Sequence, residues 1–344
     1  MEWYDRYKPQ LTRVYGNAME AIASFPPPLN ETGLTYAAKF DPVDKDGGKD
    51  YICTLLPFWM QDSASLSDEQ CGQLALANVY GMLYFFIQDD VMDSNVAGGD
   101  WKIQLALGNM LQLEMFRIFR GLFPSDSPFW RYYDGYARIW ADSVVNEGRG
   151  NYFLTNPLLT AGKAGPVKIS VVGALLLHDS QGELGKTLKV SESTLAERIA
   201  ATEEAVDITL MTLQMLDDWA DWEEDLADGS YNGLLAMIAA GIDSAVVSDS
   251  TARDFQPGYN STALSKERIE AAIYVRGCMK PYAEIAVRYH GQLLANPFAP
   301  PDLVAFNLYM LESLHRIADQ LEERKRKLLG GGINLLFAGL QQAH

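Results

Sequence analysis

Apolar residues recur along almost the whole chain at the three- and four-residue spacing of an α-helix. Ser67–Gln70 and Thr194–Glu197 have the capping-box pattern that starts a helix. The sequence has no strand-length alternation bounded by turns, no repeat and no low-complexity tract. We therefore predict an all-α protein. The predicted helices cover residues 2–24, 51–60, 67–93, 100–122, 128–146, 164–178, 194–227, 232–241, 264–294 and 301–329.

Proline and glycine set several of these boundaries. Pro26–Pro28 ends the first helix, because proline cannot continue one, and a polar loop follows through Asp50. Pro281 predicts a kink in the helix that contains it, and Gly330–Gly332 predicts the end of the last helix. No change in composition marks a linker. We therefore predict a single domain over residues 1–344, a large helical bundle around a central apolar cavity, on which the N-terminal helix and loop of residues 1–50 pack.

Composition narrows the possible partners. The chain of 344 residues is 48% hydrophobic and carries a net charge of −17, which argues against nucleic acid or an anionic membrane surface. Its three cysteines show no CxxC spacing, which fits a reducing compartment. The longest apolar run, Ile169–Leu177, is too short to span a bilayer. We expect a cytoplasmic protein without stable membrane insertion.

The segment Leu210–Asn232 begins apolar and then carries seven carboxylates within twelve residues. Gln214, Asp217 and Asp221 fall on one helical face, and that face continues through Asp225 or Glu224. Carboxylates on one face of a helix repel one another, so this arrangement is costly unless cations bind there.

A second acidic cluster, Asp89–Asp93, lies 128 residues upstream at the end of another apolar run, and Phe86 shares a face with Asp89 and Asp93. Mg²⁺ prefers oxygen ligands and commonly shares them with substrate phosphates. Two acidic helical faces predict one multi-metal site between them, for a substrate with a long hydrocarbon and a diphosphate head. The alternative is an acidic helix end that is merely solvated.

Four segments carry a resemblance to the class I isoprenoid synthase superfamily. Phe85–Ser94 (FFIQDDVMDS) resembles the first aspartate-rich motif of its trans-prenyltransferases, and Gln214–Asp221 resembles the second, QxxDDxxD. Lys163–Gly165 resembles the KTG element, whose lysine contacts the diphosphate, and Gly47–Lys49 resembles an N-terminal GGK stretch. The resemblance covers residues 47–232 and implies an all-α enzyme that uses three Mg²⁺ ions.

The motifs and the helical faces give the candidate site residues. The candidate metal ligands are Asp89, Asp90, Asp93, Asp217, Asp218, Asp221, Glu224 and Asp225, of which Asp89, Asp93, Asp217 and Asp221 are the candidate catalytic carboxylates. The candidate substrate-binding residues are Lys163, Lys168, Gln214, Phe86, Arg288 and Arg316. For Lys168 a snorkelling surface lysine is the alternative, and Arg316 competes with Arg288 for one role. The loop 242–262 is a candidate lid.

Departures from the family pattern point to the reaction. Asp50 follows the GGK stretch where prenyltransferases have basic residues, Asn95–Asp100 holds no arginine pair, and Asp228–Asn232 holds no lysine. The pocket for isopentenyl diphosphate is therefore predicted to be missing. A terpene cyclase needs no such pocket, because it ionises one C15 or C20 prenyl diphosphate and closes the chain on itself.

Other functions stay open. Asp221–Tyr231 also resembles the DxxEDxxxG…Y motif of squalene and phytoene synthases, which condense two prenyl diphosphates head to head. A head-to-tail prenyltransferase is the other enzymatic alternative. A non-catalytic homologue, acting as a regulatory subunit or carrier, would be expected to have lost metal ligands, whereas both motifs are complete here. Homodimers are common in the superfamily, but these residues do not reveal an interface.

Overall fold

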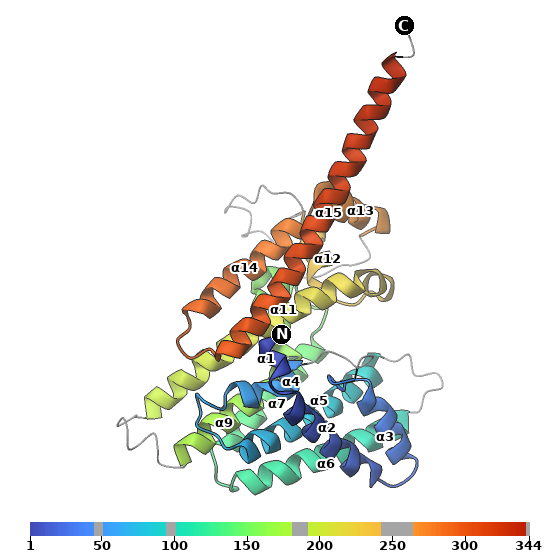
Figure 1. The fold of residues 1–344 in the computed structure, drawn as a ribbon. Coiled ribbons are helices and arrows are strands. Elements are labelled where there is room, and N and C mark those ends of the chain that lie inside the picture. Colours follow the sequence, from blue (N-terminus) through green and yellow to red (C-terminus); the bar gives the residue numbers. More distant parts are fainter. Residues whose placement is uncertain (45–50, 94–100, 181–191, 242–263, 342–344) are drawn as a thin grey trace. The chain divides into compact units, whose positions relative to one another are not determined.

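The computed structural model describes residues 1–44, 51–93, 101–180, 192–241 and 264–341. Within these ranges the side chains at positions 93, 179–180, 192–193 and 328–341 are outside the description. All regular elements in these ranges are helices, and the ranges contain no strand (Figure 1). The predicted all-α class is confirmed.

Contacts between residues divide the chain into two compact units. Unit 1 comprises Met1–Val144, Lys163–Val206 and Pro297–Ala305. Unit 2 comprises Val145–Gly162, Asp207–Asn296 and Phe306–His344. The single domain over residues 1–344 stays a prediction.

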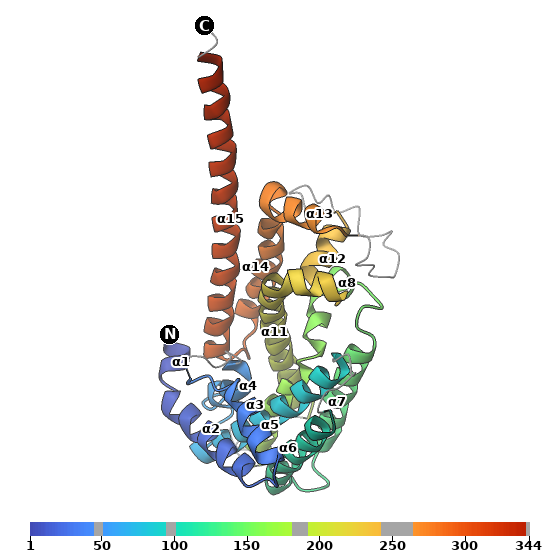
Figure 2. The same ribbon diagram turned by 90° about the vertical axis from the view of Figure 1, so that its right-hand side faces the viewer.

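Unit 1 is built around one long helix, α5. This helix packs against α2, α4, α6, α9 and the 3₁₀ turn η2, and its long contact with α6 is visible in Figures 1 and 2. The helices of the unit are α1 (Glu2–Asp5), α2 (Lys8–Ala23), α3 (Leu29–Ala38), α4 (Tyr51–Trp59), α5 (Asp68–Asp93), α6 (Trp101–Leu122), α7 (Phe129–Val145), the 3₁₀ turn η2 (Gly165–Lys168) and α9 (Ile169–Ser180).

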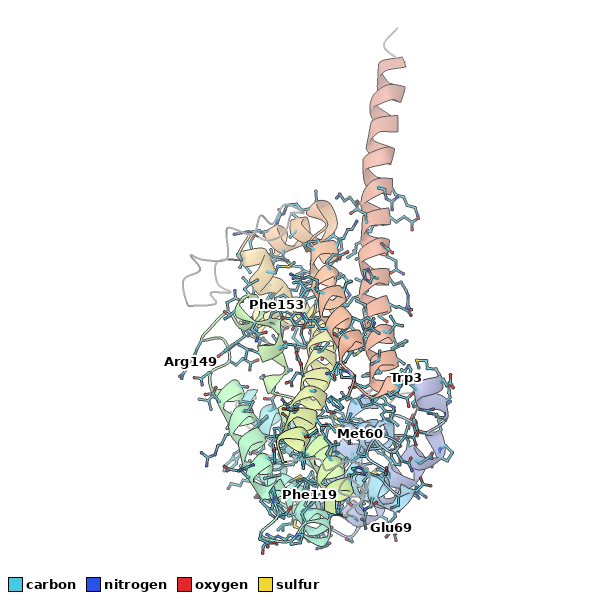
Figure 3. All side chains as sticks on the ribbon, turned by 90° about the vertical axis from the view of Figure 1, so that its left-hand side faces the viewer. Trp3, Met60, Glu69, Phe119, Arg149 and Phe153 are labelled. Atoms are coloured by element: carbon cyan, nitrogen blue, oxygen red, sulfur yellow. The ribbon has the colours of Figure 1, made fainter. Side chains whose placement is uncertain are left out.

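The start of α5 follows from its sequence. The Gln70 N–H donates to Ser67 Oγ at 3.2 Å, and the Ser67 N–H donates to Gln70 Oε1 at 2.9 Å, so the predicted capping box is formed. Most of the helix is then buried, and Met60 and Phe119 are among the buried side chains around it in unit 1 (Figure 3). A helix that is apolar on nearly all sides requires such neighbours.

The prediction of a loop from Pro28 to Asp50 was wrong for its first part, because α3 lies there. The sequence of α3 contains Asn, Thr and Gly, which are poor helix formers, so local propensity gave no signal. Packing supplies the stability instead. A Cβ added to Gly33 would lie 2.7 Å from Ile22 and 2.9 Å from Leu107, which shows how closely α3 approaches α2 and α6.

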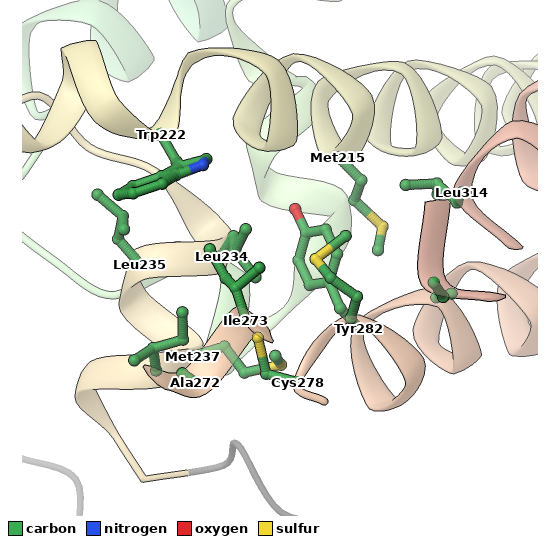
Figure 4. Packing of buried hydrophobic residues seen from close by; sticks show 14 of the residues in the cluster. Met215, Trp222, Leu234, Leu235, Met237, Ala272, Ile273, Cys278, Tyr282 and Leu314 are labelled. Carbon is green, nitrogen blue, oxygen red and sulfur yellow. The ribbon is translucent and has the colours of Figure 1, made fainter. Parts of the chain in front are cut away.

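Unit 2 has a buried core to which all of its α-helices and its π-helical turn contribute. Met215, Trp222, Leu234, Ile273 and Tyr282 are at most 4% exposed and pack in one cluster (Figure 4). The elements of the unit are α8 (Tyr152–Thr155), the 3₁₀ turn η1 (Pro157–Gly162), α11 (Glu192–Asp228) from Asp207 onward, α12 (Gly233–Ala239), α13 (Lys266–Glu270), the π-helical turn η4 (Ala271–Arg276), α14 (Met279–Ala295) and α15 (Pro301–Gln341) from Phe306 onward.

Two boundary predictions in this unit were wrong. The segment 264–294 breaks at Gly277, whose φ of +80° is left-handed, and Pro281 lies in the first turn of α14. The first turn tolerates proline because its N–H groups have no partner within the helix. The run Gly330–Gly332 does not end α15, which continues to Gln341. Glycine weakens a helix by about 1 kcal/mol per residue, but it keeps its N–H and can adopt helical dihedral angles.

In the described part of the chain, no helix is both long and apolar enough to cross a bilayer.

Candidate active site

The first acidic motif lies where α5 leaves the interior of unit 1. Phe85 is 8% exposed, the Asp89 side chain is 34% exposed, and Asp90 is exposed. Asp93 is the last residue of the helix, one turn after Asp89, so its backbone places it on the same face. The helix therefore carries apolar side chains up to the point where its carboxylates begin.

Lys163 lies next to this motif. Its Nζ is 3.8 Å from Asp89 Oδ1, and both side chains are about one-third exposed. An ion pair with this much solvent access contributes little to stability, on the order of 0–1 kcal/mol. The ammonium group can therefore exchange its partner for an anionic ligand at low cost. The lysine and the carboxylate that the sequence predicted at one site are close together.

The Asp90 side chain accepts a hydrogen bond from a residue of α3. The Tyr36 hydroxyl donates to Asp90 Oδ2 at 2.8 Å. Burial of the phenol, with the neighbouring carboxylate, raises the pKa of Tyr36, so the hydroxyl keeps its proton and remains a donor. Sequence reasoning missed Tyr36 because it lay in a predicted loop.

Aromatic rings lie beside the same motif. The Phe86 ring is 5.2 Å from the Phe40 ring, and the Phe85 ring is 4.9 Å from the Trp140 ring, measured between centroids. Phe86 is half-buried, so one side of it packs on Phe40 and part of it faces solvent. Its contact with a substrate stays a prediction.

Lys168 has a different environment from Lys163. It is 8% exposed, and its Nζ lies 5.8 Å from the centroid of the Tyr136 ring, whose hydroxyl donates to Glu203. The surface alternative for Lys168 does not fit this burial. A role in diphosphate binding stays a prediction.

The second acidic motif lies on α11 in unit 2, and its side chains differ in solvent exposure. Asp217, Asp221 and Glu224 are exposed, and Gln214 and Asp225 are half-buried. These residues recur at helical spacing and form the predicted carboxylate face.

Asp218 differs from the other carboxylates of the motif. It is 3% exposed, and both of its side-chain oxygens accept hydrogen bonds. Gln214 Nε2 donates to Oδ1 at 3.0 Å, while the Gly233 N–H and the Tyr282 hydroxyl donate to Oδ2 at 2.9 and 3.0 Å. Burial raises the pKa of Asp218 to about 7, against the lowering effect of these donors. This geometry is that of an internal acceptor, and the metal role of Asp218 stays a prediction.

Asn232 completes the network and was not identified from the sequence. It is fully buried and caps α12, because its Oδ1 accepts from the Leu235 N–H at 3.0 Å. Its Nδ2 donates to the backbone carbonyl of Asp218 and to Asp225 Oδ2, both at 2.8 Å. An asparagine directly before the apolar stretch GLLAMIA was the available signal, since asparagine is a preferred N-cap residue.

Tyr231 joins the end of α11 to α8. Its hydroxyl accepts from the Phe153 N–H at 2.7 Å and donates to Asn151 Oδ1 at 3.2 Å. Asn151 Oδ1 also accepts from the Leu154 N–H and caps α8. The tyrosine of the DxxEDxxxG…Y pattern therefore has a structural role in this unit.

The contacts described above do not include the two candidate arginines. Arg288 on α14 and Arg316 on α15 are exposed, and their roles stay predictions. Gly47–Lys49 and Asp50, Asn95–Asp100 and the candidate lid 242–262 lie outside the described residues.

The donor groups fit Mg²⁺ in type. All the candidate metal ligands are carboxylates, which provide the hard oxygen ligands that this ion prefers. Among the described residues, no three His, Cys, Asp or Glu side chains are close enough to hold one ion. The face from Asp217 to Asp225 extends over about 12 Å of helix, too far for one ion. Mg²⁺ is commonly bound by one or two carboxylates with substrate phosphates and water, so such a donor set suits Mg²⁺ that arrives with a diphosphate.

Comparison with known proteins bears on the fold. No protein-family model matches the chain, and no curated protein matches its sequence. The structure is similar to a crystal structure of polyprenyl synthetase from Streptomyces coelicolor A3(2), with a TM-score of 0.56 and 16% sequence identity. The alignment covers 89% of this chain and 98% of that chain. The chain therefore has the all-α fold of an isoprenoid synthase, as the motifs predicted.

Proposed function

We propose that this protein is a class I terpene synthase. It binds one C15 or C20 prenyl diphosphate, breaks the bond between C1 and the diphosphate oxygen, and closes the hydrocarbon into a ring with release of pyrophosphate. The observation that carries the proposal is the Lys163 ammonium group 3.8 Å from Asp89 at the end of the apolar helix α5. The isoprenoid-synthase fold supports it.

The carboxylates have the role of metal ligands in this proposal. Asp89 and Asp93 on α5 would hold Mg²⁺, with Asp90 beside them, and Asp217, Asp221 and Asp225 on α11 would do the same, with Glu224 beside them. Bound Mg²⁺ would supply the positive charge that neutralises the diphosphate and stabilises it as a leaving group. Asp218 is left out of this set because its oxygens accept three internal hydrogen bonds.

Lys163 binds the diphosphate directly. Its ammonium group donates hydrogen bonds to phosphate oxygens, and these strengthen as negative charge develops on the leaving group. The contact with Asp89 holds the ammonium group near the metal ligands before substrate arrives. Arg288 and Arg316 remain candidates for further diphosphate contacts.

The aromatic residues at the end of α5, and one on α7, protect and guide the hydrocarbon. When the C–O bond breaks, its electron pair leaves with pyrophosphate, and C1 becomes part of an allylic cation. The π electrons of a distal double bond attack this cation and close the ring, and the final cation either loses a proton or adds water, whose oxygen then loses a proton. The faces of Phe85, Phe86 and Trp140 stabilise passing positive charge and exclude water until that last step.

Head-to-tail prenyl transfer is the second candidate, because the similar structure is that of a polyprenyl synthetase. The two activities differ in their need for isopentenyl diphosphate. Purified protein with Mg²⁺ is given geranyl, farnesyl or geranylgeranyl diphosphate, each with and without isopentenyl diphosphate. The organic extract is measured by gas chromatography with mass spectrometry, and the aqueous phase is examined for longer diphosphates.

A cyclic hydrocarbon or alcohol from one substrate alone supports the terpene synthase. Longer diphosphates formed only with isopentenyl diphosphate contradict it and establish head-to-tail transfer. A C30 or C40 hydrocarbon establishes head-to-head condensation, the reaction that the Asp221–Tyr231 pattern also resembles. Tight Mg²⁺-dependent binding of substrate without turnover supports the non-catalytic alternative.

A further inference from the structure

We propose that Asn232 is a positioning residue that orients the Asp225 carboxylate for metal binding, and that Asp218 holds Asn232 in place. This inference rests on the proposed function, because it assumes that Asp225 binds a metal ion. It assigns roles to two buried residues, one in the second acidic motif and one in the turn that follows.

The contacts of Asn232 allow a single orientation of its amide. The Leu235 N–H requires the carbonyl oxygen on one side, so the amide nitrogen faces the other side. Both hydrogens of that nitrogen have acceptors at 2.8 Å, the backbone carbonyl of Asp218 and Asp225 Oδ2. Because Asn232 is fully buried and uses both donors and its acceptor, its side chain cannot turn without breaking hydrogen bonds away from water.

This fixed amide restricts Asp225. A half-buried aspartate on a helix can otherwise change its side-chain dihedral angles, and a metal ligand loses affinity when its orientation is free. The hydrogen bond to Oδ2 selects one orientation of the carboxylate. Groups that orient a metal ligand in this way commonly affect metal affinity by about 10- to 100-fold.

Asp218 supports the turn that contains Asn232. Its Oδ2 accepts from the backbone N–H of Gly233, the residue after Asn232, and from Tyr282 on α14. A Cβ at position 233 would lie 2.8 Å from this oxygen, so the turn lies directly against the carboxylate. The two adjacent aspartates therefore have different roles, since Asp217 is exposed on the metal face and Asp218 anchors the residue that orients Asp225.

The chain offers a matched pair of variants. In Asn232→Ser, serine can still cap α12, but the two amide donors are lost. Asn151→Ser makes the same change at the N-cap of α8. The Asn151 side chain contacts Tyr231 and the Leu154 N–H. If Asn232→Ser does not fold, Asn232→Thr keeps a capping oxygen and fills more of the space.

The probe is Mn²⁺ in the presence of inorganic pyrophosphate, with free Mn²⁺ measured by electron paramagnetic resonance. We expect Asn232→Ser to weaken Mn²⁺ binding about 10- to 100-fold and Asn151→Ser to leave it within about threefold of the wild type. In an Asp225→Asn background, Asn232→Ser should cause no further loss, because its effect acts through Asp225.

Three results would overturn the inference: unchanged binding in Asn232→Ser, an equal loss in Asn151→Ser, or an undiminished further loss in the Asp225→Asn background. A different result bears on the proposed function itself. If Asp225→Asn alone leaves Mn²⁺ binding unchanged, Asp225 is not a metal ligand, and the assignment of the α11 carboxylates fails with it.

Discussion

Tyr282 on α14 donates a hydrogen bond to Asp218 on α11, with 3.0 Å between the hydroxyl oxygen and Oδ2. Its hydroxyl points toward α11 from within the core of unit 2 (Figure 4). Asp217, the preceding residue, is exposed. Two adjacent carboxylates of one sequence motif therefore lie in opposite environments, and the proposed function assigns metal binding to the exposed one.

This division predicts different effects of the same substitution at the two positions. Asp217→Asn should lower Mg²⁺-dependent release of pyrophosphate from a prenyl diphosphate by about 100-fold or more, because it removes a metal ligand. Asp218→Asn should lower it less than about tenfold. The asparagine oxygen can accept from Gly233 and Tyr282, and its NH₂ can donate to Gln214 Oε1 after that amide turns over. Equal losses of pyrophosphate release in the two variants would indicate that Asp218 is also a metal ligand.

Stability should depend on pH through Asp218. Its pKa is about 7 in the folded protein, compared with an ordinary 3.8, so between these values the folded chain binds the proton more strongly than the unfolded chain. The stabilisation is complete below about pH 4 and is lost as the pH rises through 7. The slope from this residue is at most about 1.4 kcal/mol per pH unit.

Urea unfolding at several pH values between 4 and 8, with metal removed by a chelator, measures this effect. The asparagine of Asp218→Asn resembles the protonated acid, so the variant should have a flatter profile and be at least as stable as the wild type at pH 8. An identical pH profile in both proteins would show that Asp218 is already ionised in the folded state.

The contact between Asp218 Oδ2 and the backbone at position 233 also requires a glycine there. In Gly233→Ala the new Cβ would lie 2.8 Å from Asp218 Oδ2 and 2.9 Å from the Phe153 ring. We expect a loss of about 1–3 kcal/mol in the free energy of unfolding. Gly291→Ala is the control, since a Cβ there meets nothing within 4 Å, and alanine should stabilise α14 by up to about 1 kcal/mol. A neutral Gly233→Ala would mean that the turn can move away from Asp218.

The break in the helix before α14 can be tested with a further pair of substitutions. Gly277 has a φ of +80°, so Gly277→Ala should cost about 1–2 kcal/mol in the free energy of unfolding. Pro281→Ala should change it by less than about 1 kcal/mol, because the proline lies in the first turn of a helix. Urea unfolding of the two variants and the wild type measures both changes in free energy. A larger loss of stability in Pro281→Ala than in Gly277→Ala would indicate that Pro281 causes the break.

Much of the fold could be predicted because the apolar spacing of the long helices agrees with their packing. The capping box at Ser67–Gln70 is an example, since a local pattern alone determines it. Helix α3 could not be predicted, because close packing at Gly33 stabilises it rather than its own residues. The end of α15 was placed too early because three glycines weaken a helix without preventing it.

The candidate site was predictable in part. The proximity of Lys163 to Asp89 agrees with the motifs that named these residues. The different environments of Asp217 and Asp218 could not be predicted from the letters DD, because tertiary packing determines which of the two is buried. Asn232 and Tyr36 contribute contacts that depend on residues 7 and 54 positions away, and no local pattern reports such contacts.

The proposed function requires the acidic motifs to ionise a prenyl diphosphate without a second substrate. The most direct test measures pyrophosphate released from farnesyl or geranylgeranyl diphosphate alone, with Mg²⁺ and with chelator, for the wild type and for Asp89→Asn. We predict release that requires Mg²⁺ and falls by about 100-fold or more in the variant. Release that is equal in Asp89→Asn, or that occurs only after isopentenyl diphosphate is added, would contradict the account.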